Sequence, residues 1–347
     1  MVNRSKYRKE LFNEMNHKDE CLLSVIIPVY KTERYLEECL DSILEQKIED
    51  YEILIVNDGS TDTSKDIILS YKAKYPFIRY FEQENSGQGT ARNVGIDNAR
   101  GKYIYFMDSD DYLAEGKLKE MLICADQNDL DAIFFDGKAF LHENPEKNMD
   151  RFNYKRSKEY GLFSQGELLL HEFSQNNEVI ISPCLYITKR RIIVDNKLYF
   201  PDHFKHEDEY FTVTLFLYIN KCFHTNKEVF MRRVRANSTM TNPNKIPSFQ
   251  GYVNVLQFFD RTYSSFKFKT DVGRKAYRKK MKQLTKASFR SYSQIVEKDK
   301  VQNELKVLNK FVEKYQSFDL LTYLYISISK SNSLLSIYSN IAIKIKK

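Results

Sequence analysis

The chain has 347 residues, enough for about two domains of ordinary size. With 42% apolar residues, 29% charged residues, 11 Gly and 7 Pro, its composition supports a buried core and excludes a collagen-like or globally disordered chain. The net charge of +7 is unevenly divided: residues 1–244 carry 33 Lys/Arg against 40 Asp/Glu (net −7), and residues 245–347 carry 21 against 7 (net +14). This asymmetry predicts either a basic C-terminal region that meets an anionic partner, a membrane surface or nucleic acid, or a merely soluble basic helical region.

Apolar runs rich in β-branched residues alternate with amphipathic helical patterns along the chain. We expect Thr61 or Asp62 to be the N-cap of a helix at 62–74. Residues 137–180 show no clear pattern, and a further helix at 208–220 and a strand at 229–234 follow. The earlier patterns predict helices at 33–46, 62–74, 90–99 and around 118–125, and strands at 22–29, 52–57, 78–82, 102–107 and 132–135. This alternation predicts an α/β fold of the doubly wound, Rossmann-like kind, with a mostly parallel sheet flanked by helices.

The pattern breaks at Thr241–Asn244, beyond which the chain is basic, helical in pattern and rich in Tyr and Phe. We therefore expect a polar extension at 1–21, an α/β domain at 22–244 with halves at 22–136 and 137–244, and a basic, mainly helical region at 245–347. No apolar stretch reaches about 18 residues without a charge, and the first residues lack an apolar core, so we expect neither a transmembrane helix nor a secretory signal. Five scattered cysteines without a Cys-x-x-Cys pair predict reduced thiols, no zinc site and a cytoplasmic location.

Polar residues follow three of the predicted strands at their carboxyl ends. Tyr30 follows the first strand, Asp58-Gly59-Ser60 ends the second, and Asp108-Ser109-Asp110 ends the fourth. In open α/β sheets, ligands bind beyond the carboxyl ends of the strands. These three clusters can therefore converge on one ligand.

The acidic turn is the first candidate site. Asp108 and Asp110, two positions apart on a turn after a strand, can reach one hard cation, and Mg²⁺ or Mn²⁺ bound there would neutralise a substrate diphosphate; Asp111 is a third carboxylate beside them. Three clustered carboxylates also repel one another unless a cation compensates them. A solvated turn or a helix N-cap is the alternative explanation.

Two further segments fit a nucleotide. Asp58 can accept a hydrogen bond from a base while Tyr30 stacks on the ring, although a strand-to-helix turn also explains this segment. The small residues of Asn85–Asn93 allow close backbone approach to an anion at a helix N-terminus, and Arg92 supplies a fixed positive charge there. A loop with a surface arginine is the alternative.

Two later segments offer a base and a clamp. His206-Glu207-Asp208-Glu209 opens a predicted helix, where acidic residues favour the helix dipole and one carboxylate can act as general base. Arg232-Arg233-Val234-Arg235, followed by Ser238, is either a basic surface strand or a phosphate clamp.

In this order and spacing, these motifs resemble glycosyltransferase family 2, and more narrowly the bacterial enzymes that build capsular or other surface polysaccharides. The resemblance covers about residues 22–240 and weakens between 137 and 200. The segments that carry it are SVIIPVY (24–30), SILEQ (42–46), EILIVNDGSTD (52–62), NSGQGTARNVGI (85–96), GKYIYFMDSDD (101–111) and HEDEYF (206–211).

The resemblance implies the GT-A fold and an inverting transfer of sugar from a nucleotide donor, usually UDP-linked. Residues 22–136 would form the nucleotide-binding half and 137–244 the acceptor half. Asp108 would lie by the ribose or the metal, Asp110 would ligate Mn²⁺ or Mg²⁺, and Arg92 would fall near the diphosphate and the acidic cluster. The base would be held by Pro28, Val29, Tyr30 and Asp58, with Ser109 also on the donor side.

On the acceptor side, the resemblance implies that Asp208 is the catalytic base, with Glu207 beside it. The stretch Arg233–Ser238, including Arg235, would form a closing loop, and Arg232 stands where many relatives have an aromatic residue. The chain has no Trp and hence no Gln-x-x-Arg-Trp motif of the processive synthases, which implies a single addition. Which sugar is transferred stays open among UDP-glucose, UDP-galactose and the UDP-N-acetylhexosamines.

Other functions remain as alternatives. A nucleotidyltransferase would need a Gly-rich phosphate loop after the first strand, which the sequence lacks. A non-catalytic member of a polysaccharide assembly complex would not need the acidic residues that are present. For the basic region, Phe266–Tyr292 and the apolar Leu320–Ile345 suit an anionic bilayer that carries a lipid-linked acceptor, so that the protein would be peripheral on the inner face of the cell membrane. Packing against the catalytic body is the alternative, and nucleic acid is the less favoured partner.

Overall fold

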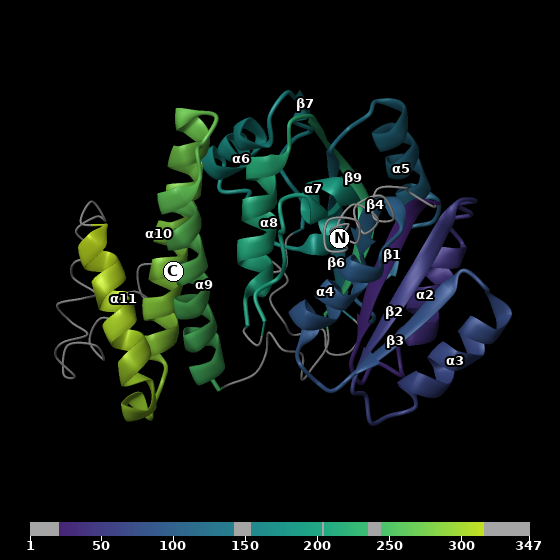
Figure 1. Ribbon diagram of the computed structural model, residues 1–347, viewed down its shortest axis with the longest axis horizontal. Helices are drawn as coiled ribbons and strands as arrows, with labels where there is room; N and C mark the ends of the chain where they lie inside the picture. The colour runs from purple at the N-terminus through teal and green to yellow at the C-terminus, as the bar shows by residue number, and fades with distance from the viewer. Residues whose placement is uncertain (1–20, 142–153, 203–204, 235–243, 316–347) are drawn as a thin grey trace, which may run out of the picture.

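A nine-stranded mixed sheet organises the protein, for which a computed structural model describes residues 21–141, 154–202, 205–234 and 244–315 (Figure 1). The order is β3-β2-β1-β4-β8-β6-β9-β5, with β7 paired to β9. The first four strands along the chain run parallel, and β8 is antiparallel to both β4 and β6. The strands are β1 (Cys21–Val29), β2 (Tyr51–Asp58), β3 (Ile78–Gln83), β4 (Gly101–Phe106), β5 (Tyr112–Leu113), β6 (Ala132–Leu141), β7 (Gly161–Phe163), β8 (Tyr186–Lys189) and β9 (Cys222–Val234).

Helices cover both faces of this sheet because successive residues of the buried strands point to opposite sides. In β1, Val25 and Ile27 pack in one apolar cluster and Ile26 in the other. The first cluster lies under α2 (Leu36–Leu44), α3 (Ser64–Lys74) and α5 (Lys117–Gln127). The second lies under α4 (Gln88–Asn98), α6 (Gly166–Gln175), α7 (Arg190–Val194) and α8 (Glu207–Tyr218).

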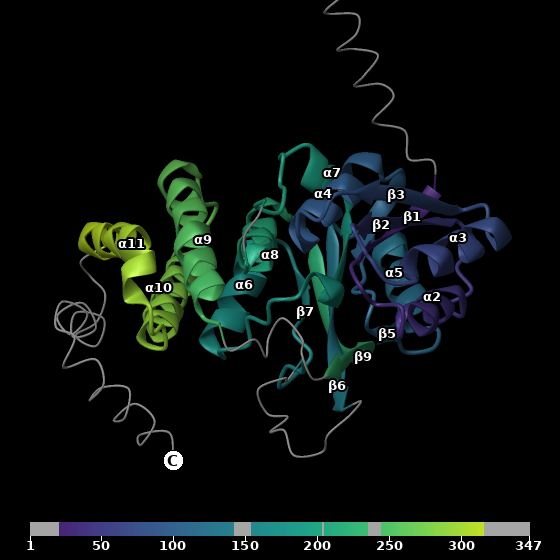
Figure 2. The ribbon, with the colours of Figure 1, turned by 90° about the horizontal axis from the view of Figure 1, so that it is seen from below.

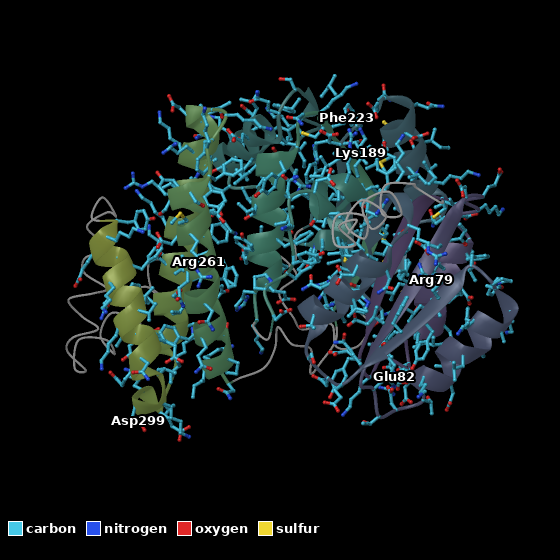
Figure 3. The ribbon with its side chains drawn as sticks, in the orientation of Figure 1. Arg79, Glu82, Lys189, Phe223, Arg261 and Asp299 are labelled. Carbon is cyan, nitrogen blue, oxygen red and sulfur yellow. The ribbon has the colours of Figure 1, made fainter. Side chains whose placement is uncertain are left out.

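Three C-terminal helices extend the second layer (Figures 1 and 2). They are α9 (Ile246–Ser265), α10 (Asp271–Ser293) and α11 (Gln302–Lys314). One short 3₁₀ turn, Lys298–Val301, lies between α10 and α11, and another, Pro183–Leu185, precedes β8. Tyr277 and Phe289 of α10 are buried in the same apolar cluster as Phe211 of α8. Side chains fill the space between these helices in Figure 3. The C-terminal helices therefore share their core with the α/β part.

A buried carboxylate also joins the two parts. Glu167, at the start of α6, accepts hydrogen bonds from the backbone amides of Lys269 and Thr270 at 2.9 and 2.7 Å, and from the Thr270 hydroxyl at 2.7 Å. The domain division at residues 244 and 245 stays a prediction, since α9 begins at Ile246 but packs without a break in the core.

The six predicted strands are confirmed, but several boundaries differ from the sequence-based expectation. Strands β6 and β9 are longer than predicted because they pair with each other in parallel over most of their length. The segment 137–180 contains the end of β6, β7 and α6.

The predicted cap of α3 is wrong: the N-cap is Thr63. Glu33, from the loop before α2, accepts a hydrogen bond from the Thr63 amide at 2.8 Å and so fixes the start of the helix one residue later. None of the helices that the structure describes combines the length and apolar character needed to span a bilayer.

Candidate active site

The acidic turn after β4 is held by arginines. Asp108 is buried, and its Oδ1 accepts hydrogen bonds from Gln88 and Arg92, each at 2.8 Å. Its Oδ2 accepts from Arg232 at 3.1 Å. Burial alone would raise the pKa of Asp108, but the two guanidiniums outweigh burial and hold that pKa below its usual range. Asp108 is therefore ionised in the folded protein.

Asp111 is the more deeply buried carboxylate of the turn. Its Oδ2 lies 3.3 Å from Arg232, and its Oδ1 accepts from the backbone amide of Arg233 at 2.6 Å. Burial raises the pKa of Asp111, and the neighbouring charges of Asp110 and Asp108 add to this against the opposing effect of Arg232. Arg232 thus bridges two carboxylates that would otherwise repel each other.

The rest of the turn is fixed through its backbone and Ser109. The Ser109 hydroxyl accepts a hydrogen bond from Thr32 at 3.0 Å, and Arg233 donates to the backbone carbonyl of Asp110 at 2.9 Å. Arg233 also pairs with Glu38 and is itself buried. Asp110 is less buried than its two acidic neighbours, so it is the carboxylate of this turn that solvent reaches best.

At the neighbouring strand ends, Asp58 organises the loop that leads into α4. It accepts hydrogen bonds from Gln83 at 2.7 Å and from the amides of Ser86 and Gly87 at 2.8 and 3.0 Å. Gly87 has φ of +93°, a conformation that favours glycine. Tyr30 is 45% exposed at the end of β1, with the Lys31 ammonium 5.2 Å from its ring centroid.

Pro28 and Val29 are buried within β1. Their side chains belong to the sheet, and Tyr30 is the first exposed side chain beyond it. The nucleotide-binding roles of these three residues and of Asp58 stay predictions.

Arg92 connects the acidic turn to the predicted base motif. Its guanidinium lies 2.8 Å from Asp108 and 3.3 Å from Glu207, and its side chain is only 3% exposed. Glu207 can pack this closely against α4 because Gly89 has no side chain: a Cβ at that position would lie 2.7 Å from the Glu207 side chain. Burial raises the pKa of Glu207, against the opposing charge of Arg92.

Asp208 follows Glu207 in the first turn of α8. Its Oδ1 accepts a hydrogen bond from the backbone amide of Glu209 at 2.9 Å. Part of Asp208 still reaches solvent, but protein atoms crowd its carboxylate, and this burial, together with the charges of Glu207 and Glu209, raises the pKa of Asp208 to about 8. Such a carboxylate takes up a proton near neutral pH, which suits a general base.

The structure thus brings Arg92, Asp108, Glu207 and Arg232 into one network, with Asp208 beside it. Arg235 and Ser238, predicted in a closing loop, lie outside the described residues. Sequence reasoning missed Gln88, which precedes Arg92 by one helical turn, and did not place Arg232 between the carboxylates. Its position directly before Arg233 in a basic strand was the only signal.

A divalent cation fits this site only as one shared with substrate. Among the described residues, no three His, Cys, Asp or Glu side chains are grouped to enclose a metal. Mg²⁺ is commonly bound by one or two carboxylates, with waters and substrate phosphates as its remaining ligands. Asp110, the carboxylate of this turn that solvent reaches best, would supply such an oxygen, and this metal-binding role stays a prediction.

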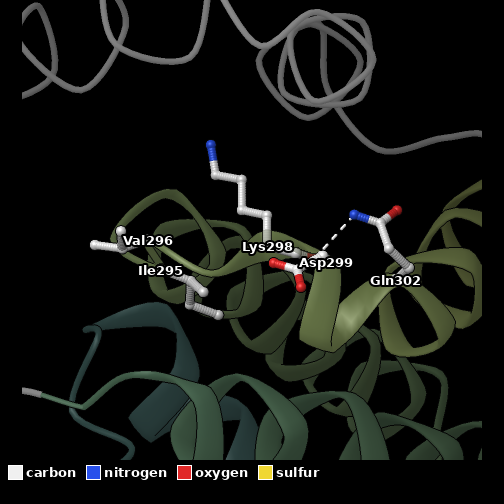
Figure 4. Close-up of a pocket in the computed structure, with 5 residues that line it drawn as sticks. All are labelled: Ile295, Val296, Lys298, Asp299 and Gln302. Carbon is white, nitrogen blue, oxygen red and sulfur yellow. Dashed lines mark hydrogen bonds between the residues drawn. The ribbon is translucent and has the colours of Figure 1, made fainter.

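A surface pocket lies elsewhere, at the turn between α10 and α11 (Figure 4). Its lining offers one carboxylate and one amine, whereas the acidic turn gathers several groups of each charge. The chemistry therefore favours the acidic turn as the candidate site. The pocket is lined by Ile295, Val296, Lys298, Asp299 and Gln302.

The sequence matches a known family over this region. Residues 24–195 fit the model of the family described as "Glycosyl transferase family 2". These residues form a glycosyl transferase family 2 domain. The match includes the acidic turn and Arg92, and it ends before the segment that holds Glu207 and Asp208.

Two curated relatives are also named as glycosyltransferases. The chain is 40% identical over 126 residues to the uncharacterized glycosyltransferase EpsJ of Bacillus subtilis (strain 168), which is 36% of each chain. It is 31% identical over 210 residues to the poly(ribitol-phosphate) beta-glucosyltransferase of Bacillus spizizenii, 57% of this chain and 30% of the relative. The chain therefore spans about a third of the length of these two relatives.

Solved structures share the fold. TarS 1–349 of S. aureus, in complex with UDP, superposes with a TM-score of 0.68 at 20% identity, covering 92% of this chain and 91% of that one. The mannosyltransferase PcManGT of Pyrobaculum calidifontis, in complex with GDP-Man and Mn²⁺, gives 0.56 at 14% identity, covering 96% and 89%. The glycosyl transferase family 2 domain thus has the expected GT-A fold, and its mostly parallel sheet with a C-terminal helical region is confirmed.

Arg232→Met removes the guanidinium between Asp108 and Asp111. We expect the free energy of unfolding in metal-free buffer to fall by roughly 3–5 kcal/mol, because a buried charge loses its partner. We also expect tighter Mn²⁺ binding without nucleotide, since the metal then replaces the missing cation. Urea unfolding and titration followed by Mn²⁺ electron paramagnetic resonance measure the two effects.

Arg34→Met is the matched control, because Arg34 is an exposed arginine in the loop before α2. It should leave both measurements within error of the parent. An unchanged Mn²⁺ affinity in Arg232→Met would contradict competition between Arg232 and a metal for these carboxylates.

Proposed function

We propose that this protein transfers one sugar, with inversion, from a nucleotide sugar, most simply a UDP-sugar, to a hydroxyl of a glycan or lipid-linked acceptor in surface polysaccharide synthesis. The observation that carries the proposal is the Arg92 bridge, which places the donor-side acidic turn and the acceptor-side base motif in one buried network. The family match supports transfer of sugar. The UDP-GlcNAc, UDP and GDP-Man complexes of the fold relatives support a nucleotide donor.

In this proposal the reaction is a single displacement at the anomeric carbon. Asp208 takes the proton from the acceptor hydroxyl as that oxygen attacks. Arg92 holds Glu207 and Asp108 in place, and in this proposal Asp208 and the metal at Asp110 would act from opposite sides of the sugar. Inversion then needs no covalent sugar–enzyme intermediate.

The leaving diphosphate needs positive charge. Asp110 would hold Mn²⁺ or Mg²⁺, with Asp108 and Ser109 beside it, and the metal would neutralise the phosphates as the bond breaks. Arg92 and Arg232 supply fixed positive charge at the same edge of the sheet. Tyr30 and Asp58 would receive the base at the ends of β1 and β2.

The alternatives carry less support. A nucleotidyltransferase is disfavoured because β1 leads into Tyr30-Lys31 rather than a Gly-rich phosphate loop. A non-catalytic assembly partner would have no use for a carboxylate whose pKa is raised to about 8 next to a buried arginine. A screen of UDP-glucose, UDP-galactose, UDP-GlcNAc and UDP-GalNAc hydrolysis with Mn²⁺ tests the proposal, and turnover of none of them would overturn the UDP-sugar assignment.

The place of action is also proposed: the cytoplasmic face of an anionic membrane that carries the acceptor. The expectation that aromatic residues of 266–292 anchor in lipid is wrong for the described ones that are buried in the core, such as Tyr277 and Phe289. The basic face of α10 remains, because Lys275, Lys282 and Lys286 follow one another at helical spacing. The apolar segment Leu320–Ile345 lies outside the described residues.

Asp110→Ala should reduce donor hydrolysis in saturating Mn²⁺ by at least about a hundredfold, comparable with the loss of a major electrostatic stabiliser. The cause is the loss of the carboxylate that would hold the metal. UDP release measures the rate. Asp126→Ala, at a half-exposed carboxylate on α5, is the control and should retain the parent rate. Near-parent turnover by Asp110→Ala would remove Asp110 from the metal site.

Asp208→Asn should keep UDP binding and lose turnover, because the amide keeps the shape but cannot take a proton. In the parent, turnover should rise with pH up to about 8, since Asp208 is protonated below its raised pKa and acts as a base only above it. Calorimetry with UDP and a pH–rate profile measure the two effects. Loss of UDP binding would place Asp208 on the donor side, and an inactive Glu207→Gln beside an active Asp208→Asn would reassign the base.

Binding to vesicles of phosphatidylglycerol and phosphatidylcholine tests the membrane proposal. The triple variant Lys275→Gln, Lys282→Gln, Lys286→Gln should bind roughly a hundredfold less tightly at low salt, at about 1 kcal/mol for each lysine near an anionic surface. High salt should weaken binding of the parent.

The control has the same change in charge on α3, far from α10 (Figure 1). It replaces the exposed residues Lys65, Lys72 and Lys74 by Gln. Equal vesicle binding by the two triple variants would reject docking through α10, and selective binding of the parent to RNA would favour a nucleic-acid partner.

A further inference from the structure

The residue before the base motif has an unusual backbone. His206 is the N-cap of α8, with φ of +70° and ψ of +24°, in the left-handed region. A non-glycine residue there is uncommon and persists where surrounding contacts hold it. Because His206 directly precedes Glu207 and Asp208, its backbone sets the direction from which α8 starts.

The contacts that hold His206 come from a distant part of the chain. Its imidazole stacks on the ring of Tyr252 in α9, with centroids 3.7 Å apart and planes 6° apart. Its Nε2 lies 2.8 Å from the hydroxyl of Ser248, also in α9. Burial, with the charges of Lys205 and Lys280, lowers the pKa of His206 to about 4, so the ring is neutral at physiological pH.

Two further contacts place the C-terminal helices against residues 205–209, the base motif and the residue before it. Gly251 of α9 lies so close to the preceding segment that a Cβ would be 2.4 Å from the Lys205 carbonyl oxygen. Lys280 of α10 pairs with Glu209 at 2.6 Å in a largely buried contact. Arg92 therefore contacts the base motif at Glu207, while α9 contacts it at His206 and α10 at Glu209.

We propose that His206 is a positioning residue, through which the Ser248–Tyr252 segment of α9 holds Asp208 in line with the acceptor hydroxyl. The inference rests on the proposed role of Asp208 as the base. It assigns to the C-terminal helices a part in the reaction: they complete the base side of the site, while the donor side is built from the first half of the chain with Arg232 and Arg233 of β9.

A positioning role predicts a specific kinetic defect. In the proposed function the donor would contact the acidic turn and the ends of β1 and β2, whereas Ser248 and Tyr252 contact His206. Loss of the stack should therefore lower kcat and leave donor binding unchanged. A purely structural role would lower stability and leave kcat per folded molecule near that of the parent.

The experiment uses the full chain and hydrolysis of the UDP-sugar that turns over fastest in a screen of the four common UDP-hexoses with Mn²⁺. Tyr252→Leu removes the stacked ring, and we expect kcat to fall at least about tenfold, with KM and the Kd for UDP within about twofold of the parent. Ser248→Ala, which removes only the hydrogen bond, should give a smaller fall in kcat of the same kind. Tyr252→Phe keeps the ring and should restore kcat.

Tyr263→Leu is the matched control: the same change in the same helix, at a residue that packs on Tyr277 rather than on the base motif. It should keep the parent kcat. Parent-like kcat in folded Tyr252→Leu, or equal losses in Tyr252→Leu and Tyr263→Leu, would overturn the inference. Asp208→Asn in the same assay separates the two proposals: if it turns over like the parent, the assignment of the base fails, whereas an inactive Asp208→Asn beside a parent-like Tyr252→Leu rejects only the role of His206.

Discussion

The rest of the site depends on one buried guanidinium. Arg92 lies between Asp108 and Glu207, two carboxylates that are 99 positions apart in the sequence and that both pair with its guanidinium. Asp108 and Glu207 are both buried, so water could not take the place of the guanidinium as a partner for their charges. Removing the guanidinium would leave two buried anions facing each other. Its Nε has no hydrogen-bond partner among the described residues, a cost that the two ion pairs must offset.

Charge balance explains the remaining arrangement. The acidic turn carries more negative charge than one arginine can compensate, and Arg232 and Arg233 enter from the far end of β9 to meet Asp108, Asp111 and the backbone of the turn. β9 begins at Cys222, shortly after α8, and its other end, at Arg232 and Arg233, lies against the acidic turn. The sequence left open whether this basic strand is a solvated surface or a phosphate clamp; in the structure the Arg233 side chain is 3% exposed and that of Arg232 20% exposed, so a solvated surface strand is excluded.

The sequence predicted well those features that depend on local pattern. The strands 22–29, 52–57 and 102–107 are largely buried and consist mainly of apolar residues, which is why the α/β fold could be inferred from the pattern, whereas 78–82 is the half-buried edge strand β3. The first turn of α8 was also predictable, because its acidic residues precede an apolar helix. The family resemblance placed Arg92 near the acidic cluster, but its bridge to Glu207 and the contacts of Arg232 and His206 were not predicted, since the partners lie far away in the sequence and no local pattern encodes such pairs. The aromatic residues of α10 were ambiguous for the same reason: spacing alone does not say whether a face meets lipid or protein.

The hydrogen bonds of Glu167 bear on how this architecture can be recombined. One carboxylate in α6 satisfies three donors in the loop between α9 and α10, and a Cβ on Gly273 would clash with it at 2.4 Å. A chimaera that exchanged only the C-terminal helices with those of another protein would leave this carboxylate buried opposite a foreign loop. Grafting α6 together with α9 and α10 would transfer the Glu167 carboxylate and its three hydrogen-bond donors together. The suitable crossover point therefore lies before Gly166 rather than at the apparent boundary near Ile246.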